Sequence, residues 1–374
     1  MMKFFLIFKK LLFTLFTFII FFILCDLLFS NFIYNEKNQV RYDCFKYEYF
    51  SYNKVNYNDY YLDKNCTATE KQRTVIPYKV ITDQNGYRYS GKERSPNSNN
   101  LVFLGDSFTY GYGVKYENSF PGLLENMIKD HNIYNLGVPG YGLQKYYYTL
   151  SNFFFKKNKA KKIFITMDMT DVADASFRWT FIPNSKSPVV KSEKVNNEID
   201  KWKKIKNSNF KGTRLITFHL RNFARYIKIK LKSKESDIGD AALSSDIANF
   251  TYLDIKSHTV YNEENFLDGL ENIETYFKKI SNLAKLNNSE LYLVIFPWPE
   301  NLIHGQEEFN WENFSSTLCK KNHCSGTINL FPDFEKIKDK KVNWKNIIYI
   351  KDDVHLKKFG NNLIAKKIIK ILTQ

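Results

Sequence analysis

The sequence predicts an α/β fold in which helices cover both faces of a parallel sheet. From Leu101 onward, short apolar runs alternate with longer amphipathic stretches. This alternation is typical of parallel strands joined by helical crossovers. Several of the runs also end in glycine or aspartate, as strands do where they enter a functional edge. A long apolar segment stands before this pattern, so we expect an α/β body behind one N-terminal hydrophobic helix.

The expected elements follow one another in regular order. Strands are predicted at Leu101–Leu104, Ile133–Leu136, Ile163–Thr166, Leu291–Phe296, Ile328–Phe331 and Ile347–Ile350. Helices are predicted at Ser119–Lys129, Leu143–Phe155, Asn265–Leu286 and His355–Leu372. The first helix has the sharpest start signal, because Ser119 is a good cap and Pro121 falls in the first turn.

Residues 1–30 are predicted to be an uncleaved membrane anchor. Leu11–Ser30 is almost entirely apolar, and about 20 residues at 1.5 Å each span about 30 Å, the thickness of a bilayer core. Three lysines precede this segment, which places the N-terminus in the cytoplasm and the body on the exported side. A cleaved signal peptide and a lipoprotein signal are the alternatives. No small residues follow the apolar run, however, and Phe22-Ile23-Leu24 rather than small residues precede Cys25. Asp26 is interpreted as marking the membrane edge.

The rest of the chain divides into two parts. Residues 31–100 form a polar, tyrosine-rich lead-in that we expect to be irregular, and residues 101–374 form the α/β body. Within the body, residues 175–264 break the alternation and include a possible amphipathic helix at Leu215–Leu231. We interpret this stretch as an insertion that partly covers the site, or equally as a solvated excursion.

Four cysteines lie outside the anchor, which fits an oxidising compartment. The simplest pairing joins Cys44 to Cys66 and Cys319 to Cys324, although the sequence alone leaves the pairing open. Cys319, His323 and Cys324 could suggest a metal site, but their spacing is poor for structural zinc.

The formal net charge is +16, yet the sequence contains no recognisable nucleic-acid-binding module. Runs of lysine are usually solvated faces, and the predicted exported topology also disfavours a nucleic-acid partner. Attraction to anionic lipid or to an acidic surface polymer is a less favoured alternative. The oligomeric state is left open.

Candidate functional residues follow the ends of three predicted strands. Ser107 follows the first strand in Gly105-Asp106-Ser107, Gly137 follows the second, and Asp171 follows the third. Ligands of an open parallel sheet bind beyond the carboxyl ends of the strands. A Gly-Asp-Ser tripeptide by itself is a common turn, but this convergence favours a serine nucleophile, with His355 as the base that activates it.

These motifs together resemble the blocks of the GDSL, or SGNH, hydrolase superfamily. The matching blocks are Gly105-Asp106-Ser107, Gly137, and Asp352-x-x-His355 followed by Gly360. Asn85-Gly86-Tyr87-Arg88 is similar to a lead-in of membrane-anchored bacterial members. The resemblance covers about residues 80–174 and 265–374, and it implies a flavodoxin-like three-layer α/β/α sandwich with a Ser-His-Asp triad.

The resemblance implies roles for particular residues. Ser107 would be the nucleophile, His355 the base, and Asp352 the carboxylate that orients His355 through a single turn, with Asp353 as the alternative. The oxyanion hole would use the N–H groups of Ser107 and Gly137.

The third block departs from the family pattern. Thr170 stands where the family has an asparagine that completes the oxyanion hole, which puts the level of activity in doubt. Asp168, or a group from the insertion, could reshape the site. Asp168, Asp171 and Asp174 could also suggest a cation site, but acidic residues at this spacing more often decorate a helix start, and neither a metal nor a cofactor is expected.

The sequence therefore predicts an exported, membrane-anchored serine esterase acting on an acylated small molecule or glycan. By resemblance, the preferred substrate is an O-acetyl ester of a cell-envelope carbohydrate. Two alternatives remain, an acyltransferase with the same triad and a non-catalytic glycan-binding or assembly component that retains the fold.

Overall fold

The structure is a computed structural model of the whole chain, and it describes residues 2–33, 44–53, 55–70, 77–183, 185–191, 209–213, 216–217, 220, 263–306, 309–351 and 353–373. The chain forms two compact units. One consists of residues 1–39 and 192–239, and the other of residues 40–191 and 240–374.

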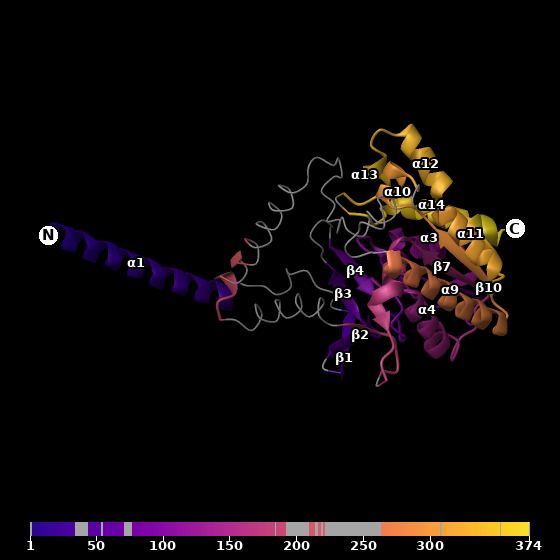
Figure 1. Cartoon of the computed structure of the whole chain (residues 1–374), viewed down its shortest axis with the longest axis horizontal. Coiled ribbons are helices and arrows are strands. Elements are labelled where there is room, and N and C mark those ends of the chain that lie inside the picture. Colours follow the sequence, from indigo (N-terminus) through magenta and orange to yellow (C-terminus); the bar gives the residue numbers. More distant parts are fainter. Residues whose placement is uncertain are drawn as a thin grey trace. The chain divides into compact units, whose positions relative to one another are not determined.

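A five-stranded sheet forms the centre of the larger unit (Figure 1). Its strands are β5 (Asn99–Leu104), β6 (His131–Asn135), β7 (Lys162–Met167), β10 (Glu290–Ile295) and β11 (Gly326–Asn329). They are all parallel and lie in the order β11-β10-β7-β5-β6. Counted along the chain, this is the flavodoxin-like order 2-1-3-4-5. The predicted α/β class with a parallel sheet is confirmed.

The sheet is the core because its central strands are apolar on both faces. Residues 101–104 of β5 are fully buried, as are residues 163–165 of β7, which is expected when helices cover a parallel sheet. Two pairs of helices pack together: α3 (Phe120–Met127) with α14 (Lys358–Leu372), and α4 (Leu143–Thr149) with α9 (Glu263–Leu286). The further α-helices among the described residues of this unit are α2 (Ser107–Tyr110), α5 (Thr170–Ala173), α10 (Pro299–His304), α11 (Trp311–Lys321), α12 (Phe331–Lys340) and α13 (Trp344–Ile348).

The predicted strand at Ile347–Ile350 is wrong. Residues 344–348 form the short helix α13, and Tyr349 makes a single bridge to Leu356. A four-residue apolar run cannot be distinguished from a buried helix segment by periodicity. The final helix also begins later than expected, at Lys358, which leaves His355 in the loop before it.

The lead-in is not irregular throughout. β1 (Phe45–Tyr52) and β2 (Val55–Leu62) pair antiparallel, and β9 (Val189–Lys191) and β8 (Trp179–Thr180) extend them to a sheet of order β1-β2-β9-β8. A second ribbon joins β3 (Thr67–Glu70) to β4 (Tyr78–Ile81). The start of the expected insertion is thus part of the antiparallel sheet.

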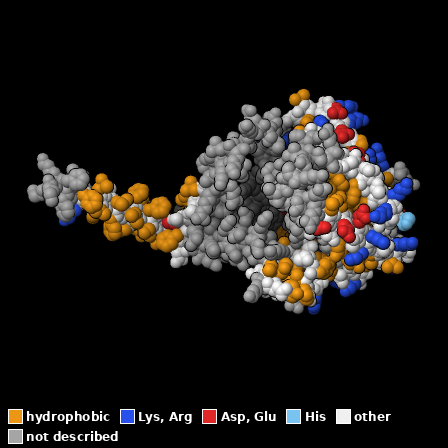
Figure 2. All heavy atoms as spheres, viewed as in Figure 1, with side chains coloured by type: hydrophobic (Ala, Val, Ile, Leu, Met, Phe, Trp, Pro, Cys, Tyr) orange, Lys and Arg blue, Asp and Glu red, His pale blue; other side chains and the backbone are white. Residues whose placement is uncertain are grey.

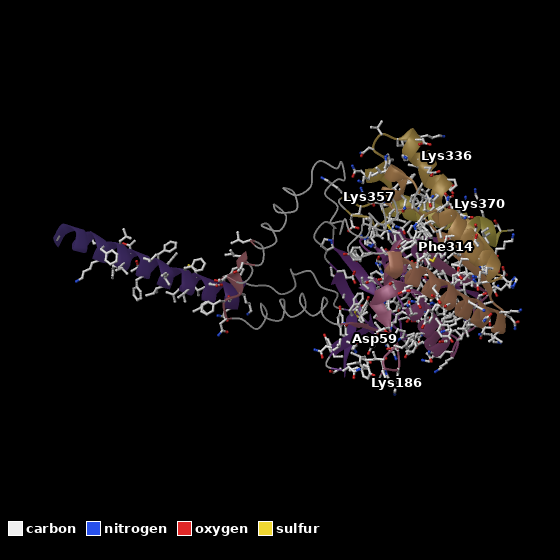
Figure 3. The ribbon with its side chains drawn as sticks, viewed as in Figure 1. Asp59, Lys186, Phe314, Lys336, Lys357 and Lys370 are labelled. Carbon is white, nitrogen blue, oxygen red and sulfur yellow. A yellow bond between two sulfur atoms is a disulfide. The ribbon has the colours of Figure 1, made fainter. Side chains whose placement is uncertain are left out.

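A buried ion pair connects this antiparallel sheet to α4. Lys145 Nζ lies 2.6 Å from Asp59 Oδ1, and Asp59 Oδ2 accepts a hydrogen bond from Ser187 at 2.5 Å. Burial lowers the pKa of Lys145, and the neighbouring charge of Asp59 opposes that effect. Asp59 is labelled in Figure 3, as is Lys186, which precedes Ser187 in the chain.

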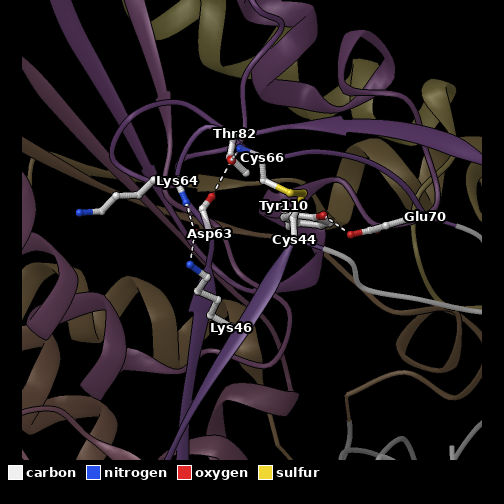
Figure 4. Close-up of a disulfide and its surroundings, with 8 residues drawn as sticks. All are labelled: Cys44, Lys46, Asp63, Lys64, Cys66, Glu70, Thr82 and Tyr110. Atoms are coloured by element: carbon white, nitrogen blue, oxygen red, sulfur yellow. Dashed lines mark hydrogen bonds and ion pairs between the residues drawn. A yellow bond between two sulfur atoms is a disulfide. The ribbon is translucent and has the colours of Figure 1, made fainter. Parts of the chain in front are cut away.

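Two disulfides match the simplest pairing, Cys44 with Cys66 and Cys319 with Cys324. The first joins the segment before β1 to the start of β3, beside Tyr110 (Figure 4). Tyr110 donates a hydrogen bond to Glu70 at 2.5 Å, so the lead-in contacts the residues that follow Ser107.

Arg88 connects the lead-in to the same segment from within the core. Its side chain is fully buried and donates to the carbonyl oxygens of Tyr110, Gly111 and Val114 at 2.7, 2.7 and 2.8 Å. The guanidinium lies 4.6 Å from the centroid of the Tyr110 ring. Tyr110 is also bonded to the buried Glu70, so one tyrosine contacts two groups of opposite charge.

In the smaller unit, α1 (Met2–Leu28) continues into the π-helical turn Phe29–Ile33. Residues Phe8–Asn31 have a mean hydropathy of 2.7 and are long and apolar enough to cross a membrane, as judged by length and composition. Of the expected helix Leu215–Leu231, residues 216, 217 and 220 are described and helical; the remainder lies outside the described residues.

We expect Arg88→Met to lower the free energy of unfolding by about 3–5 kcal/mol, the range for breaking a buried charge arrangement. Three carbonyl groups lose their donor and Glu70 loses the nearby positive charge. Arg88→Lys keeps the charge but cannot reproduce the guanidinium fork, so it should be intermediate. Urea unfolding in detergent measures both. A change in Arg88→Met below about 0.5 kcal/mol, typical of exposed sites, would contradict this account.

Candidate active site

Ser107 lies at the carboxyl edge of the sheet, immediately beyond β5. It begins α2, and the Asp106 carboxylate caps that helix by accepting the Phe108 N–H at 2.9 Å. Gly111 ends the helix with a φ of 83°, a conformation that glycine adopts without strain. The serine hydroxyl is therefore presented by a short, capped turn.

His355 and Asp353 complete a hydrogen-bonded chain with Ser107. His355 Nε2 lies 2.8 Å from Ser107 Oγ, and His355 Nδ1 lies 2.5 Å from Asp353 Oδ1. The same carboxylate oxygen accepts the backbone N–H of His355 at 2.9 Å. With Nδ1 protonated toward the carboxylate, Nε2 is left to accept the serine proton.

Asp353, the alternative at the sequence level, is thus the carboxylate that contacts His355. Asp352 lies outside the described residues. The helical turn assumed for a spacing of three residues is absent, because residues 353–355 form a bend before α14. In a bend, an aspartate reaches the backbone N–H two residues later, as it does in an Asx turn.

Backbone hydrogen bonds hold the bend at residues 353–355 before and after it. Ile350 N–H donates to the carbonyl of His355 at 2.8 Å, and Asp353 N–H donates to the carbonyl of Ile350 at 3.1 Å. Lys357 N–H then donates to Ile348 at 2.8 Å. These bonds hold the main chain that carries His355, although no helix includes this residue.

Two aromatic rings flank the imidazole. Tyr112 stacks on His355 with ring centroids 4.2 Å apart and an interplanar angle of 27°, and Phe108 lies 4.9 Å away at 34°. Both rings follow Ser107 in the chain, so the segment that presents the serine also restrains the histidine.

The pKa of Asp353 is lowered overall. Burial by itself would raise it, but the hydrogen bond and the charge of His355 outweigh that effect. Asp353 is therefore ionised at neutral pH, the state that stabilises a protonated imidazole.

The two other expected oxyanion donors are engaged with protein acceptors. Gly137 N–H donates to Asn135 Oδ1 at 2.9 Å, and Thr170 Oγ1 donates to Asp168 Oδ1 at 2.6 Å. A Cβ on Gly137 would lie 2.4 Å from the backbone nitrogen of Tyr110, so glycine is needed for this loop to approach α2.

Asp106, Asp168 and Asp171 are buried, and the pKa of each carboxyl group is raised. Burial, followed by repulsion from Asp168, raises the pKa of Asp106 well above its usual value. Burial likewise raises the pKa of Asp168, although hydrogen bonds from Thr170 oppose the shift. The pKa of Asp171 is raised by burial and then by the charges of Asp168 and Asp106.

These carboxylates do not form a metal site in the structure. Asp168 accepts from Thr170, while Asp171 accepts from the Asp168 N–H at 2.9 Å and from the Tyr146 hydroxyl at 3.2 Å. Within the described part of the chain, no three acidic, histidine or cysteine side chains are arranged to hold a metal ion.

The sequence does not predict the contributions of Arg88, Tyr112 and Asn135. Arg88 belongs to a recognisable motif that assigns it no role, and no pattern distinguishes Tyr112 from the other aromatic residues. Asn135 joins the site by donating to the Thr109 carbonyl at 2.8 Å while accepting from Gly137. Its place two residues before Gly137, at the end of a strand, is the one local signal that pointed to it.

We expect the contribution of Asp171 to the free energy of unfolding to become less favourable as pH rises above about 4, the usual carboxyl range. A carboxyl group with a raised folded pKa keeps a proton that the unfolded chain has already released, so folding is disfavoured as pH rises through that window. Asp171→Asn removes one such group, and asparagine can still face the Asp168 N–H and the Tyr146 hydroxyl.

Urea unfolding between pH 4 and pH 8 tests this, with the exposed Asp268→Asn as the matched control. The fall in stability should be shallower in Asp171→Asn than in the parent and in the control. Parallel curves for all three proteins would count against the buried-carboxylate account.

Comparison with known proteins gives distant structural matches. No family model and no curated protein matches the chain. A lipolytic protein of the G-D-S-L family from Desulfitobacterium hafniense DCB-2 matches with 14% identity and a TM-score of 0.39, over 73% of this chain and 99% of that one. A member of the same lipolytic family from Veillonella parvula DSM 2008 matches with 13% identity and a TM-score of 0.36, over 74% and 100%.

An acetylxylan esterase from Geobacillus stearothermophilus matches with 10% identity and a TM-score of 0.39, over 74% of this chain and 95% of that one. The first two proteins carry the name of the family that the sequence motifs resemble. At these identities and scores the likeness carries no weight of its own, and function is inferred from the geometry of the site.

Proposed function

We propose that this chain is a serine esterase of the GDSL, or SGNH, type. The observation that carries the proposal is the continuous contact from Ser107 Oγ through His355 to Asp353 at the carboxyl edge of the parallel sheet. Serine nucleophiles need a base within hydrogen-bond reach and a third group that orients the base. In this proposal His355 is the base and Asp353 is the group that orients it, and both come from a part of the chain distant from Ser107.

In the proposed reaction, Ser107 Oγ attacks the carbonyl carbon of an ester while His355 Nε2 takes the hydroxyl proton. The bond from the acyl carbon to the leaving alcohol breaks, and His355 returns the proton to that alcohol. Water then attacks the acyl-enzyme with His355 again as base, which releases the acid and restores Ser107. Asp353 stabilises the imidazolium in both steps.

For the oxyanion we propose three donors: the N–H groups of Ser107 and Gly137, and the Thr170 hydroxyl. Ser107 N–H stands at the first turn of α2, where backbone N–H groups have no helical acceptor. Gly137 and Thr170 would have to exchange the partners they hold, Asn135 and Asp168. This cost predicts a modest turnover rate for an otherwise complete triad.

We further propose that α1 anchors the enzyme, with its N-terminus cytoplasmic and the body exported. The two disulfides support an oxidising compartment. The substrate class we propose, from the sequence resemblance, is an O-acetyl ester on a cell-envelope carbohydrate. A sugar hydroxyl in place of water would make the same site an acyltransferase.

A non-catalytic role is the second candidate. It is favoured by one observation, that the Gly137 N–H and the Thr170 hydroxyl are both occupied by protein acceptors. In that case the fold would bind acylated glycan without turning it over.

Ser107→Ala tests the esterase proposal. Release of p-nitrophenol from its acetate ester by the full chain in detergent should be lost in the variant, together with labelling by a fluorophosphonate. Both depend on the serine oxygen as nucleophile. An unlabelled parent protein that unfolds cooperatively would overturn catalysis and leave the binding role.

The carboxylate is tested by a matched pair of neighbours. Asp353→Asn should lower kcat by about 10³–10⁴-fold, because the imidazolium loses its partner and the correct tautomer is no longer enforced. Asp352→Asn is the control and should remain within about threefold of the parent, a change of less than 1 kcal/mol. The reverse pattern would assign the role to Asp352.

A further inference from the structure

The insertion contacts the anchor helix at a specific carboxylate. Asp26 Oδ1 accepts the N–H of Gly212 at 2.7 Å, and Asp26 Oδ2 accepts the N–H of Thr213 at 2.9 Å and the Thr213 hydroxyl. Ser30 Oγ accepts the N–H of Lys211 at 2.7 Å. The only charge within the apolar run thus caps the start of a second helical segment.

The residues on both sides of this contact are closely packed. Asp26 and Ser30 are 6% and 3% exposed. By contrast, Leu24 and Leu28 on α1 are 53% and 56% exposed. A Cβ on Gly212 would lie 2.5 Å from Asp26 Oδ1, so the close approach requires glycine. The arrangement explains an aspartate at a position where an unpaired charge would be costly.

In an α1 that spans the membrane, the contact lies near the exported end of the span. Asp26 precedes Asn31, where the apolar window ends, by five residues. At 1.5 Å per residue this is about 8 Å along the helix, a short distance beside the roughly 30 Å of a bilayer core. The segment that Asp26 caps therefore begins where hydrocarbon gives way to headgroups.

The described part of this segment exposes large apolar side chains. Phe210, Ile216 and Leu220 are 41%, 53% and 60% exposed. Ile216 and Leu220 are four residues apart, so they share one face of a helix. Hydrophobic side chains likewise cover the described surface of α1 (Figure 2).

The surrounding sequence is strongly basic. Residues 201–234 contain no aspartate or glutamate. Their basic residues are Lys201, Lys203, Lys204, Lys206, Lys211, Arg214, Arg221, Arg225, Lys228, Lys230, Lys232 and Lys234. Exposed apolar residues within a basic segment are typical of helices that lie in the headgroup layer of anionic bilayers. Residues 192–239 also group with residues 1–39 rather than with the larger unit.

We propose that residues 210–213, 216–217 and 220 lie in the headgroup layer of an anionic phospholipid bilayer, held against α1 by Asp26. The proposal rests on the proposed anchoring by α1 and adds a second membrane contact to it. This part of the insertion then serves as a membrane-surface element, and the basic sequence around it favours a bilayer with anionic headgroups.

Site-specific fluorescence quenching tests this in the full chain. Cys25, the free cysteine among the described residues, is replaced by serine, and single cysteines are introduced as Ile216→Cys, Phe16→Cys in α1 and Val342→Cys on the exposed surface of the body. Each is labelled with an environment-sensitive fluorophore in vesicles of phosphatidylglycerol and phosphatidylcholine. Quenchers are placed on lipids either near the headgroup or deep in the acyl chain.

We expect headgroup-level quenching at position 216, deep quenching at position 16 and none at position 342. Deep quenching at 16 without quenching at 216 would overturn the inference while leaving the anchor intact. Absence of quenching at 16 would overturn the anchoring and the inference together. In vesicles of phosphatidylcholine alone, quenching at 216 should be lost while that at 16 persists; retention at 216 would overturn the role of anionic lipid.

The role of Asp26 is tested by two variants in the same background. Asp26→Leu removes the acceptors for the Gly212 and Thr213 N–H groups, so quenching at position 216 should be lost. Asp26→Asn keeps one acceptor oxygen and should retain part of it. Both should keep deep quenching at position 16. Unchanged quenching at 216 in Asp26→Leu would overturn the Asp26 contact as the feature that holds the segment.

Discussion

The buried guanidinium of Arg88 makes the lead-in a structural part of the site. Its hydrogen bonds end on the backbone of residues 110–114, the stretch that follows the helix carrying Ser107. The same stretch carries Tyr112, whose ring lies on His355. Through these main-chain bonds, Arg88 holds both the turn that carries Ser107 and the Tyr112 ring that stacks on His355. Since carbonyl oxygens are the acceptors, the arrangement depends on main-chain shape rather than on the side chains of this loop.

The sheet supplies the other constraint, by bringing together residues 248 positions apart in the chain. Most of this was predictable, because buried parallel strands are short, continuous apolar runs that alternate with helices. The misplaced strand at 347–350 and the unforeseen strands of the lead-in share one cause. In both places the periodicity is weak, and pairing with distant segments decides the outcome.

For the site, Ser107 and His355 were predictable because a strand end and a short motif define each of them. The register of the carboxylate was not, because it depends on whether the residues before α14 form a helical turn or a bend. The stacking of Tyr112 on His355 could not be predicted from the sequence either. Aromatic residues make up 17% of the chain, so their number gives no hint of which ring meets the imidazole. The bond from Thr170 to Asp168 depends in the same way on side-chain geometry that no sequence spacing encodes.

The Cys44–Cys66 disulfide has a consequence for how the molecule tolerates damage. The bond closes a loop around β1, β2 and the tip between them. A protease that nicked the chain at this tip would leave two fragments that remain covalently joined through sulfur. The N-terminal fragment, which carries the apolar helix, would then stay attached to the body until a reductant arrived. Attachment of the apolar helix to the body would in this way not depend on an intact polypeptide backbone at this tip.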